Sequence, residues 1–410
     1  MIAQTMRWIV FILVLLLLEV YALQAFRTLF PKLKITIVYA LVSFIVYGLT
    51  ISSFYLKVEG GTFGQPRGLL MGLCLSLIVL KLVLVAFMFF EDILRVFQFL
   101  FQKIFSTESS QFPSRRKFIS TIALGLGAIP FAGILYGMFR GKYNFKVLDY
   151  KLTFEDLPPA FEGLKILQIS DIHSGSFDNK EKVEYGIELI NKQNADIIFF
   201  TGDLVNNLSS EMDTWLESFS KIKAKYGVFS ILGNHDYGDY HNWESQTAKQ
   251  FNFENLLKVH EKLGWQMLRN ENTFIEKDNQ KLHVVGVENW GKGGFKQAGD
   301  LEKASKNLSK EDFKILLSHD PSHWDEVVKT DPKHFQLTLS GHTHGMQFGI
   351  EIPGWFKWSP VQYRYQQWAG IYQHQKRCIN VNRGFGYLAY PGRVGIWPEI
   401  SVIELEKTLK

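Results

Sequence analysis

Cysteine is scarce in this sequence. Only two cysteines occur among 410 residues, Cys74 inside an apolar run and Cys378 far from it. Two such residues provide neither a disulfide framework nor a thiolate metal cluster. Any metal that the protein binds must therefore be held by nitrogen and oxygen ligands.

The sequence also has little net charge. The 45 Lys and Arg residues exceed the 40 Asp and Glu residues by only five. Much of the positive charge lies in short loops between apolar segments, where it orients helices in a membrane. The C-terminal part lacks the strong basic cluster that an exported nuclease would use to hold a phosphate backbone, so we do not expect nucleic acid as a partner.

Long apolar runs are abundant, but only in the N-terminal third. Four stretches of about 20 residues are long enough to cross a hydrocarbon core about 30 Å thick as helices. They run from about Trp8 to Phe26, Ile35 to Leu56, Gly68 to Phe90 and Phe118 to Phe139. Glu19 and Lys81 interrupt the first and third stretches, either as a functional polar site or as residues that face another helix or snorkel. We expect a transmembrane anchor at 1–142 and a second domain at 143–410.

Basic residues between these stretches predict the orientation. The first loop carries Arg27, Lys32 and Lys34, the third carries Arg95, Lys103, Arg115, Arg116 and Lys117, and the second has only Lys57 and Arg67. The first and third loops are therefore expected in the cytoplasm, which places 143–410 outside the cytoplasmic membrane. The run from Ser114 to Ile119 is either a twin-arginine export signal or an ordinary basic flank, and both place the domain outside.

From Tyr150 onward, short strand-like runs alternate with polar or helical segments, which is typical of an α/β or α+β domain. Five runs, at 164–170, 196–201, 228–232, 314–318 and 335–340, are followed within two residues by Asp, Asn or His. The residues that follow are Asp171 and His173, Asp203, Asn234 to Asp236, His319 and Asp320, and His342 and His344. Because ligands bind beyond the carboxyl ends of strands in open α/β sheets, we expect these side chains to converge. Glycines before three of the groups, at positions 202, 233 and 341, allow sharp turns and a close backbone approach.

Carboxylate, amide and imidazole groups suit divalent ions such as Mn²⁺, Fe²⁺, Co²⁺ or Zn²⁺. Seven ligand candidates are too many for one ion. They suffice for two ions that share a bridging carboxylate. Two metals about 3.5 to 4 Å apart are a common device for in-line displacement at phosphorus, in which a shared water becomes a hydroxide near neutral pH. The pattern therefore predicts metal-dependent phosphoester hydrolysis.

The ordered motifs D-x-H, G-D, G-N-H-D, H and G-H-x-H resemble the calcineurin-like metallophosphoesterase family, in its membrane-anchored bacterial branch, over about residues 163–405. The resemblance implies a four-layer sandwich in which two mixed β-sheets lie between helical layers. It also implies two ligand sets: Asp171, His173 and His344 for one metal, and Asn234, His319 and His342 for the other, bridged by Asp203. His235 would contact the scissile phosphate and protonate the leaving oxygen, with Asp236 orienting it.

Two features near the C-terminus bear on the same site. The usual fifth motif of this branch reads G-H-T-H-G-G-Q, whereas Met346 stands here before Gln347. The substitution touches no metal ligand, but it changes the pocket wall. The tail from Asn382 to Ile400 also resembles this branch, and within it Arg393 is a candidate either for a substrate phosphate contact or for a structural salt bridge.

The segment from Ile352 to Trp368 interleaves aromatic and basic residues: Trp355, Phe356, Trp358, Tyr363, Tyr365 and Trp368 with Lys357 and Arg364. This composition is typical of a surface that dips into the headgroup region of a bilayer, although a cap over the site and plain core are alternatives. It favours a lipid-linked substrate. The bond to be broken, whether in a phosphodiester, a phosphomonoester or a pyrophosphate, stays open, as does the oligomeric state.

A non-catalytic sensor or scaffold with a phosphoesterase-like domain is the competing interpretation. The complete set of candidate ligands argues against it, because a degenerate enzyme is expected to lose at least one. Histidines outside the five motifs are expected to be structural or on the surface. His241, a few residues beyond the third motif, is the one expected nearest the pocket.

Overall fold

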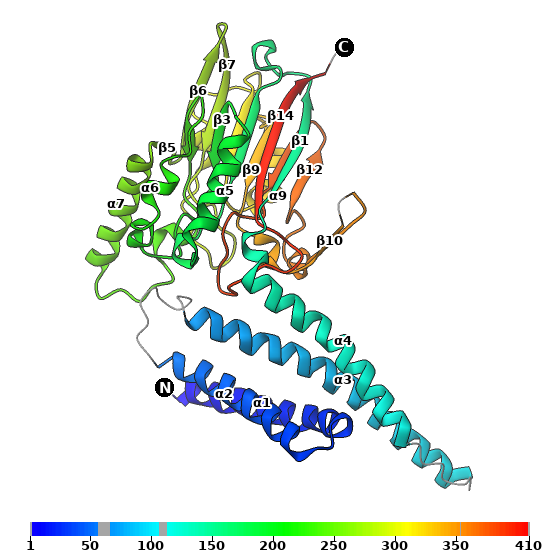
Figure 1. The fold of residues 1–410 in the computed structure, drawn as a ribbon. Helices are drawn as coiled ribbons and strands as arrows, with labels where there is room; N and C mark the ends of the chain where they lie inside the picture. The colour runs from blue at the N-terminus through cyan, green and yellow to red at the C-terminus, as the bar shows by residue number, and fades with distance from the viewer. Residues whose placement is uncertain (1, 56–65, 106–112, 353, 409–410) are drawn as a thin grey trace. The chain divides into compact units, whose positions relative to one another are not determined.

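The computed structural model describes residues 2–55, 66–105, 113–352 and 354–408 (Figure 1). Its contacts divide the chain into two compact units, one ending at Met138 and the other beginning at Phe139. The first unit contains α1 (Ile2–Leu29), α2 (Leu33–Ser53), α3 (Arg67–Phe105) and most of α4 (Pro113–Phe139). All four helices are long and apolar enough to cross a membrane, as the sequence predicts.

Several helix boundaries differ from the expectation or cannot be compared with it. Helix α1 begins at Ile2 and not at Trp8, and α4 begins at Pro113 and not at Phe118, so the basic residues 115–117 are helical. Leu56, the expected end of the second stretch, lies outside the described residues. Helix α3 continues 15 residues beyond Phe90, so Arg95 and Lys103 are helical and not part of a loop. Hydropathy marks the part of a helix that suits lipid, whereas the helix itself continues through good helix formers and the i,i+4 pair of Glu91 with Arg95.

The two charged residues inside the apolar stretches face other helices. The Lys81 ammonium is fully buried and contacts the Glu19 carboxylate. It also donates to the Ser43 hydroxyl at 2.7 Å and to the Tyr47 hydroxyl at 3.0 Å. This cluster joins α1, α2 and α3 and satisfies an ammonium that would be costly to leave alone in lipid.

The second unit contains two six-stranded sheets. The first has the order β1 (Lys146–Phe154), β14 (Glu399–Lys407), β2 (Lys165–Ile169), β3 (Ile197–Phe200), β4 (Val228–Ser230) and β5 (Trp265–Met267). The second has the order β12 (Gly370–His374), β13 (Arg377–Val381), β9 (Leu337–Ser340), β8 (Lys314–Leu317), β7 (Gln280–Gly286) and β6 (Glu271–Lys277). Both sheets are mixed, because β14 with β2 and β6 with β7 pair antiparallel while β2 with β3 and β8 with β9 pair parallel.

The two sheets pack face to face. Ile166 and Phe199 of the first sheet share a buried core with Val284, Ile315 and Leu339 of the second. Helices α5 (Lys180–Lys192), α6 (Leu216–Phe219) and α7 (Gln246–Leu263) cover the outer face of the first sheet (Figure 1). Helices α8 (Leu301–Ala304) and α9 (Ser322–Glu326) contribute to the core on the outer face of the second. The unit is therefore the four-layer sandwich that the resemblance implies.

The strands that precede the candidate ligands are buried on both faces. All residues of β3, β8 and β9 are buried, which explains why these strands read as short continuous apolar runs and not as alternating ones. Because β2, β3 and β4 are parallel neighbours, and β8 and β9 likewise, their carboxyl ends meet at one edge of each sheet. The fold thus delivers five loops to one region.

A buried histidine makes the sandwich sensitive to acid. His260 of α7 is fully buried, contacts the Ser230 hydroxyl at 3.1 Å, and has its pKa lowered by burial to about 3. As the pH falls below 6.5, His260 becomes protonated in the unfolded chain but stays neutral in the folded chain. The free energy of unfolding therefore decreases. Between about pH 7.5 and pH 5 the loss is about 2 kcal/mol.

Replacing His260 by Gln is therefore expected to remove about 2 kcal/mol of the acid destabilisation between those two pH values. Denaturant unfolding of both proteins at each pH measures the difference, and other titrating groups cancel because they are common to the two proteins. An unchanged pH dependence in His260→Gln would show that His260 is not held neutral by the fold.

Candidate metal centre

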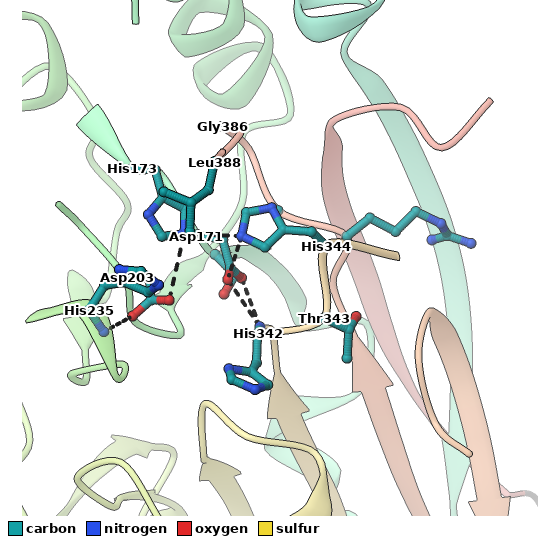
Figure 2. Close-up of polar contacts among 12 residues, drawn as sticks. Asp171, His173, Asp203, His235, His342, Thr343, His344, Gly386 and Leu388 are labelled. Atoms are coloured by element: carbon teal, nitrogen blue, oxygen red, sulfur yellow. Dashed lines mark hydrogen bonds and ion pairs between the residues drawn. The ribbon is translucent and has the colours of Figure 1, made fainter. Parts of the chain in front are cut away.

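The structure brings all seven predicted ligands together at the carboxyl ends of the strands. Figure 2 labels Asp171, His173, Asp203, His342 and His344 among them. The β2 loop supplies Asp171 and His173, and the β3 loop supplies Asp203. The β4 loop supplies Asn234, the β8 loop His319, and the β9 loop His342 and His344. Nearly all of them are buried, and their polar atoms point toward one another.

Asp171, His173 and His344 form the first group. The Nε2 atoms of the two histidines lie 3.0 Å apart, and the His344 Nε2 atom lies 3.2 Å from an Asp171 carboxylate oxygen. One ligand atom from each residue lies within 4.8 Å of the others. Two imidazole nitrogens and a carboxylate oxygen converging in a buried space form a donor set that suits a divalent transition ion.

Asn234, His319 and His342 form the second group, and Asp203 lies between the two groups. The Asn234 Oδ1 atom is 2.8 Å from the His342 Nδ1 atom. The Asp203 Oδ2 atom lies 3.1 Å from the His319 Nε2 atom and 3.6 Å from the His173 Nε2 atom. One carboxylate therefore faces ligand candidates of both groups, as a bridging ligand must.

The protonation of His319 fits a cation site. Its Nδ1 atom lies 2.7 Å from the Thr201 carbonyl oxygen, which places a hydrogen on Nδ1 and turns Nε2 toward Asp203. Burial opposes the charged imidazolium, but the Asp203 carboxylate outweighs burial and raises the pKa of His319 to about 10. The buried carboxylate thus attracts positive charge, which a metal ion supplies when it displaces such a proton.

The backbone around the candidate ligands is strained. Asp171, His173, Asp203, His342 and His344 all have positive φ angles, between 49° and 73°. Such angles are uncommon for residues other than glycine, and they concentrate at functional sites because the surrounding fold must maintain them. The strain turns each side chain sharply away from its strand and toward the common centre.

Glycine is required where the loops touch. A Cβ atom on Gly341 would lie 1.9 Å from the Ser170 hydroxyl and 2.2 Å from an Asp171 carboxylate oxygen. A Cβ atom on Gly202, whose φ is 96°, would lie 2.5 Å from the Gly233 nitrogen. The glycines therefore permit the close approach of strand ends that the sequence predicts.

The role expected for Asp236 needs correction. Its carboxylate accepts hydrogen bonds from the backbone nitrogens of Asp203 at 2.9 Å, Leu204 at 2.8 Å and Gly233 at 2.8 Å. The His235 Nδ1 atom instead lies 2.8 Å from the carbonyl oxygen of Asn206. Asp236 thus holds the β3 and β4 loops together, and a backbone carbonyl orients the His235 ring. That ring faces the first group, with its centroid 4.9 Å from that of His173.

Two tyrosines contact the second group. The Tyr365 hydroxyl lies 2.9 Å from the His342 Nε2 atom, and the Tyr240 hydroxyl accepts a hydrogen bond from the Asn234 Nδ2 atom at 2.9 Å. Tyr365 was expected in an aromatic surface, and Tyr240 is the neighbour of His241, whose ring lies 4.6 Å from that of Trp243. The residue beyond the third motif that contacts the site is therefore Tyr240, and not the predicted His241.

Replacing Tyr365 by Phe is expected to weaken metal binding by about 10- to 100-fold, because the hydroxyl fixes the ring orientation and tautomer of His342. Competition with a fluorescent chelator measures the affinity. Tyr363→Phe is the matched control, since Tyr363 is 80% exposed. Equal affinities in the two variants would rule out this role for Tyr365.

Arg393 and the aromatic segment from Ile352 to Trp368 can now be compared with the expectations. Arg393 is fully buried and donates to the carbonyl oxygens of Arg383 at 2.7 Å and Gly386 at 2.6 Å, so it holds backbone and is neither a phosphate contact nor half of a salt bridge. Within the aromatic segment, Tyr365 and Trp368 are buried, whereas Trp355 and Phe356 are exposed. The segment is therefore part core and part surface.

Two family models match the chain. A probable calcineurin-like phosphoesterase transmembrane domain matches residues 6–142, and a calcineurin-like phosphoesterase matches residues 164–346. The uncharacterized metallophosphoesterase YkuE of Bacillus subtilis is 31% identical over 301 residues, which are 72% of this chain and 98% of that protein. A transmembrane protein with metallophosphoesterase domain from Danio rerio is 27% identical to this chain over 283 residues. These residues are 67% of this chain and 60% of the Danio rerio protein.

A solved structure shows a distant likeness. The NAD nucleotidase of Haemophilus influenzae is 17% identical, with a TM-score of 0.31 over 44% of this chain and 38% of that one. The family models and the Bacillus relative agree with the motifs and with the geometry of the site. The chain belongs to the calcineurin-like metallophosphoesterase family, as a member with a four-helix transmembrane region.

Proposed function

We propose that residues 143–410 hydrolyse a phosphate ester or anhydride with two divalent ions and that residues 1–142 anchor this activity in a membrane. The observation that carries the proposal is the position of Asp203, whose carboxylate lies 3.1 Å from His319 and 3.6 Å from His173. Two bound metal ions would supply Lewis acidity and a hydroxide nucleophile near neutral pH. Mn²⁺, Fe²⁺, Zn²⁺ and Co²⁺ all suit the donor set.

In this proposal the protein itself supplies positioning and one proton. Asp171, His173 and His344 hold one ion, and Asn234, His319 and His342 hold the other. Contact with the Asn206 carbonyl keeps a hydrogen on the Nδ1 atom of His235, so Nε2 is the nitrogen that exchanges a proton. Nε2 takes up a proton from water before it gives one to the leaving oxygen, and burial, which lowers the pKa of His235, favours that transfer. Asp236 fixes the loops of Asp203 and Gly233 and thereby positions His235 beside the residues that would hold the ions.

We also propose that the substrate is linked to a lipid and that the catalytic domain lies outside the cytoplasm. The basic residues around the α1–α2 and α3–α4 connections support the orientation. The transmembrane anchor and the exposed aromatic residues near the site support the lipid linkage.

A substrate panel tests the activity. The purified full chain, loaded with Mn²⁺ or Zn²⁺, is assayed on a phosphomonoester, a phosphodiester and a pyrophosphate, each soluble or dispersed in detergent with a lipid. We expect metal-dependent release of phosphate or of the leaving alcohol from at least one lipid-linked compound. Protein that binds both ions and hydrolyses none of the panel would instead support a scaffold.

A further inference from the structure

The segment after the fifth motif exposes apolar side chains and turns its polar side chains inward. From Met346 to Ile352, exposed and covered residues alternate, and the exposed ones are Met346, Phe348, Ile350 and Ile352. The residues between them are turned inward. A strand on a water-facing surface shows the opposite pattern, with apolar residues inside and polar residues outside.

The polar side chains of this segment are used within the protein. Gln347 donates to the carbonyl oxygens of Tyr390 at 2.9 Å and Gly392 at 3.0 Å and accepts from the Leu388 nitrogen. Glu351 pairs with Arg383 at 2.5 Å. The Lys357 ammonium donates to the Ala369 carbonyl oxygen at 2.6 Å.

The segment folds as a separate hairpin with two different faces. Strands β10 (Ile350–Ile352) and β11 (Phe356–Trp358) pair only with each other, and Glu351 lies opposite Lys357. Glu351 and Lys357 are the only charged residues between Met346 and Tyr363, and both are turned inward. The outer side of the hairpin therefore carries no charge.

The resulting apolar face consists of Met346, Phe348, Ile350, Ile352, Trp355 and Phe356. These residues are 37% to 81% exposed and are six of the eleven exposed large apolar side chains described from Lys146 onward. Singly scattered apolar residues are normal on a protein surface, whereas a contiguous group marks a site that another apolar phase covers.

The transmembrane helices tether the sandwich close to a bilayer, which is an apolar phase that could cover this face. Helix α4 ends at Phe139 and β1 begins at Lys146, so at most about 25 Å of chain separates a membrane-spanning helix from the sandwich. Trp, Phe and Ile without charge are suited to the boundary between headgroups and acyl chains. A second protein copy would explain the apolar side chains but not their position beside the tether, where Gly141 approaches the Arg393 carbonyl oxygen and Phe348 pairs with Val394.

We propose that this apolar face docks into the headgroup region of the bilayer that the helices span. The face is tied to the metal centre, because Met346 is two residues from His344 and the Ser359 hydroxyl donates to the Gly345 carbonyl oxygen at 2.8 Å. Docking holds the His344 loop at the lipid surface, where it meets a phosphoester whose lipid part stays in the membrane. This second step rests on the proposed function, whereas the docking does not.

A depth measurement on the full chain tests the docking. A nitroxide label is attached to Trp355→Cys, and to Phe274→Cys as control, in nanodiscs of phosphatidylcholine and phosphatidylglycerol. Phe274 is 47% exposed on edge strand β6, and both native cysteines are buried, so the new cysteines react selectively. Relaxation by oxygen reports lipid, and relaxation by a water-soluble nickel chelate reports solvent.

We expect oxygen to dominate at position 355 and the nickel chelate to dominate at position 274. Equal exposure of both positions to the nickel chelate would overturn the proposal. Shielding of position 355 from both reagents in a dimeric particle would overturn it too, in favour of a second copy.

A kinetic comparison tests the consequence for the substrate. The double variant Trp355→Ser with Phe356→Ser is expected to hydrolyse a vesicle-borne lipid phosphodiester about tenfold more slowly, with an unchanged rate on a soluble diester. Equal losses on the two substrates would contradict a docking role. If the unsubstituted protein hydrolyses neither substrate, the proposed function fails while the labelling result stands.

Discussion

Replacing Asp203 by Asn is expected to lower turnover by about 10³-fold or more, which is about 4 kcal/mol of transition-state stabilisation. Asn keeps the size of the side chain but removes the negative charge that faces His173 and His319. Without that charge the two groups no longer share a ligand, so we expect at least one ion to be lost. Turnover and metal content, measured on the same preparation, check both statements.

Asp312→Asn is the matched control for this substitution. Asp312 lies just before β8, at the opposite end of that strand from His319, and accepts a hydrogen bond from the Ser309 nitrogen at 2.7 Å. The Asp312→Asn protein should bind two metal ions and have normal turnover. An Asp203→Asn protein that retains both ions and full activity would show that this carboxylate does not bridge a metal pair.

Replacing His235 by Gln is expected to have an effect that depends on the leaving group. With an alkyl phosphoester, whose leaving oxygen needs a proton, the rate should fall by about 10²- to 10⁴-fold. With a nitrophenyl ester, whose leaving oxygen is stable as an anion, the loss should be small. The metal content should stay unchanged, because the ring of His235 is held by the Asn206 carbonyl and is not a proposed ligand.

Asp236→Asn separates this role from a structural one. Asp236 accepts three short backbone hydrogen bonds across two loops, so its loss should lower the melting temperature and slow both substrates alike. If His235→Gln also slows both substrates to the same extent, His235 positions the loop and does not supply a proton.

The convergence of the candidate ligands was predictable because it depends on local sequence. A short buried strand followed by Asp, Asn or His can be recognised wherever it occurs, and the loops of Asp171, Asp203 and His342 confirm the convergence that this pattern predicts. The two sheets follow from the family resemblance, and the five strands expected from the sequence, β2, β3, β4, β8 and β9, lie within a residue or two of the predicted runs.

Other features depend on contacts that a sequence pattern does not reveal. The parallel pairing of β1 with β14 joins segments about 250 residues apart. The acceptor for His235 is a backbone carbonyl, which every residue offers, so nothing marks Asn206 in advance. Tyr365 and Trp355 look alike as members of one aromatic segment, and only the fold separates the ligand-holding hydroxyl from the exposed ring.

Anomalous diffraction from a crystal of the Mn²⁺-loaded protein tests the central claim most directly. We predict two peaks about 3.5 to 4 Å apart, one among Asp171, His173 and His344 and the other among Asn234, His319 and His342, with the Asp203 carboxylate between them. A single peak, or peaks away from these side chains, would contradict the account.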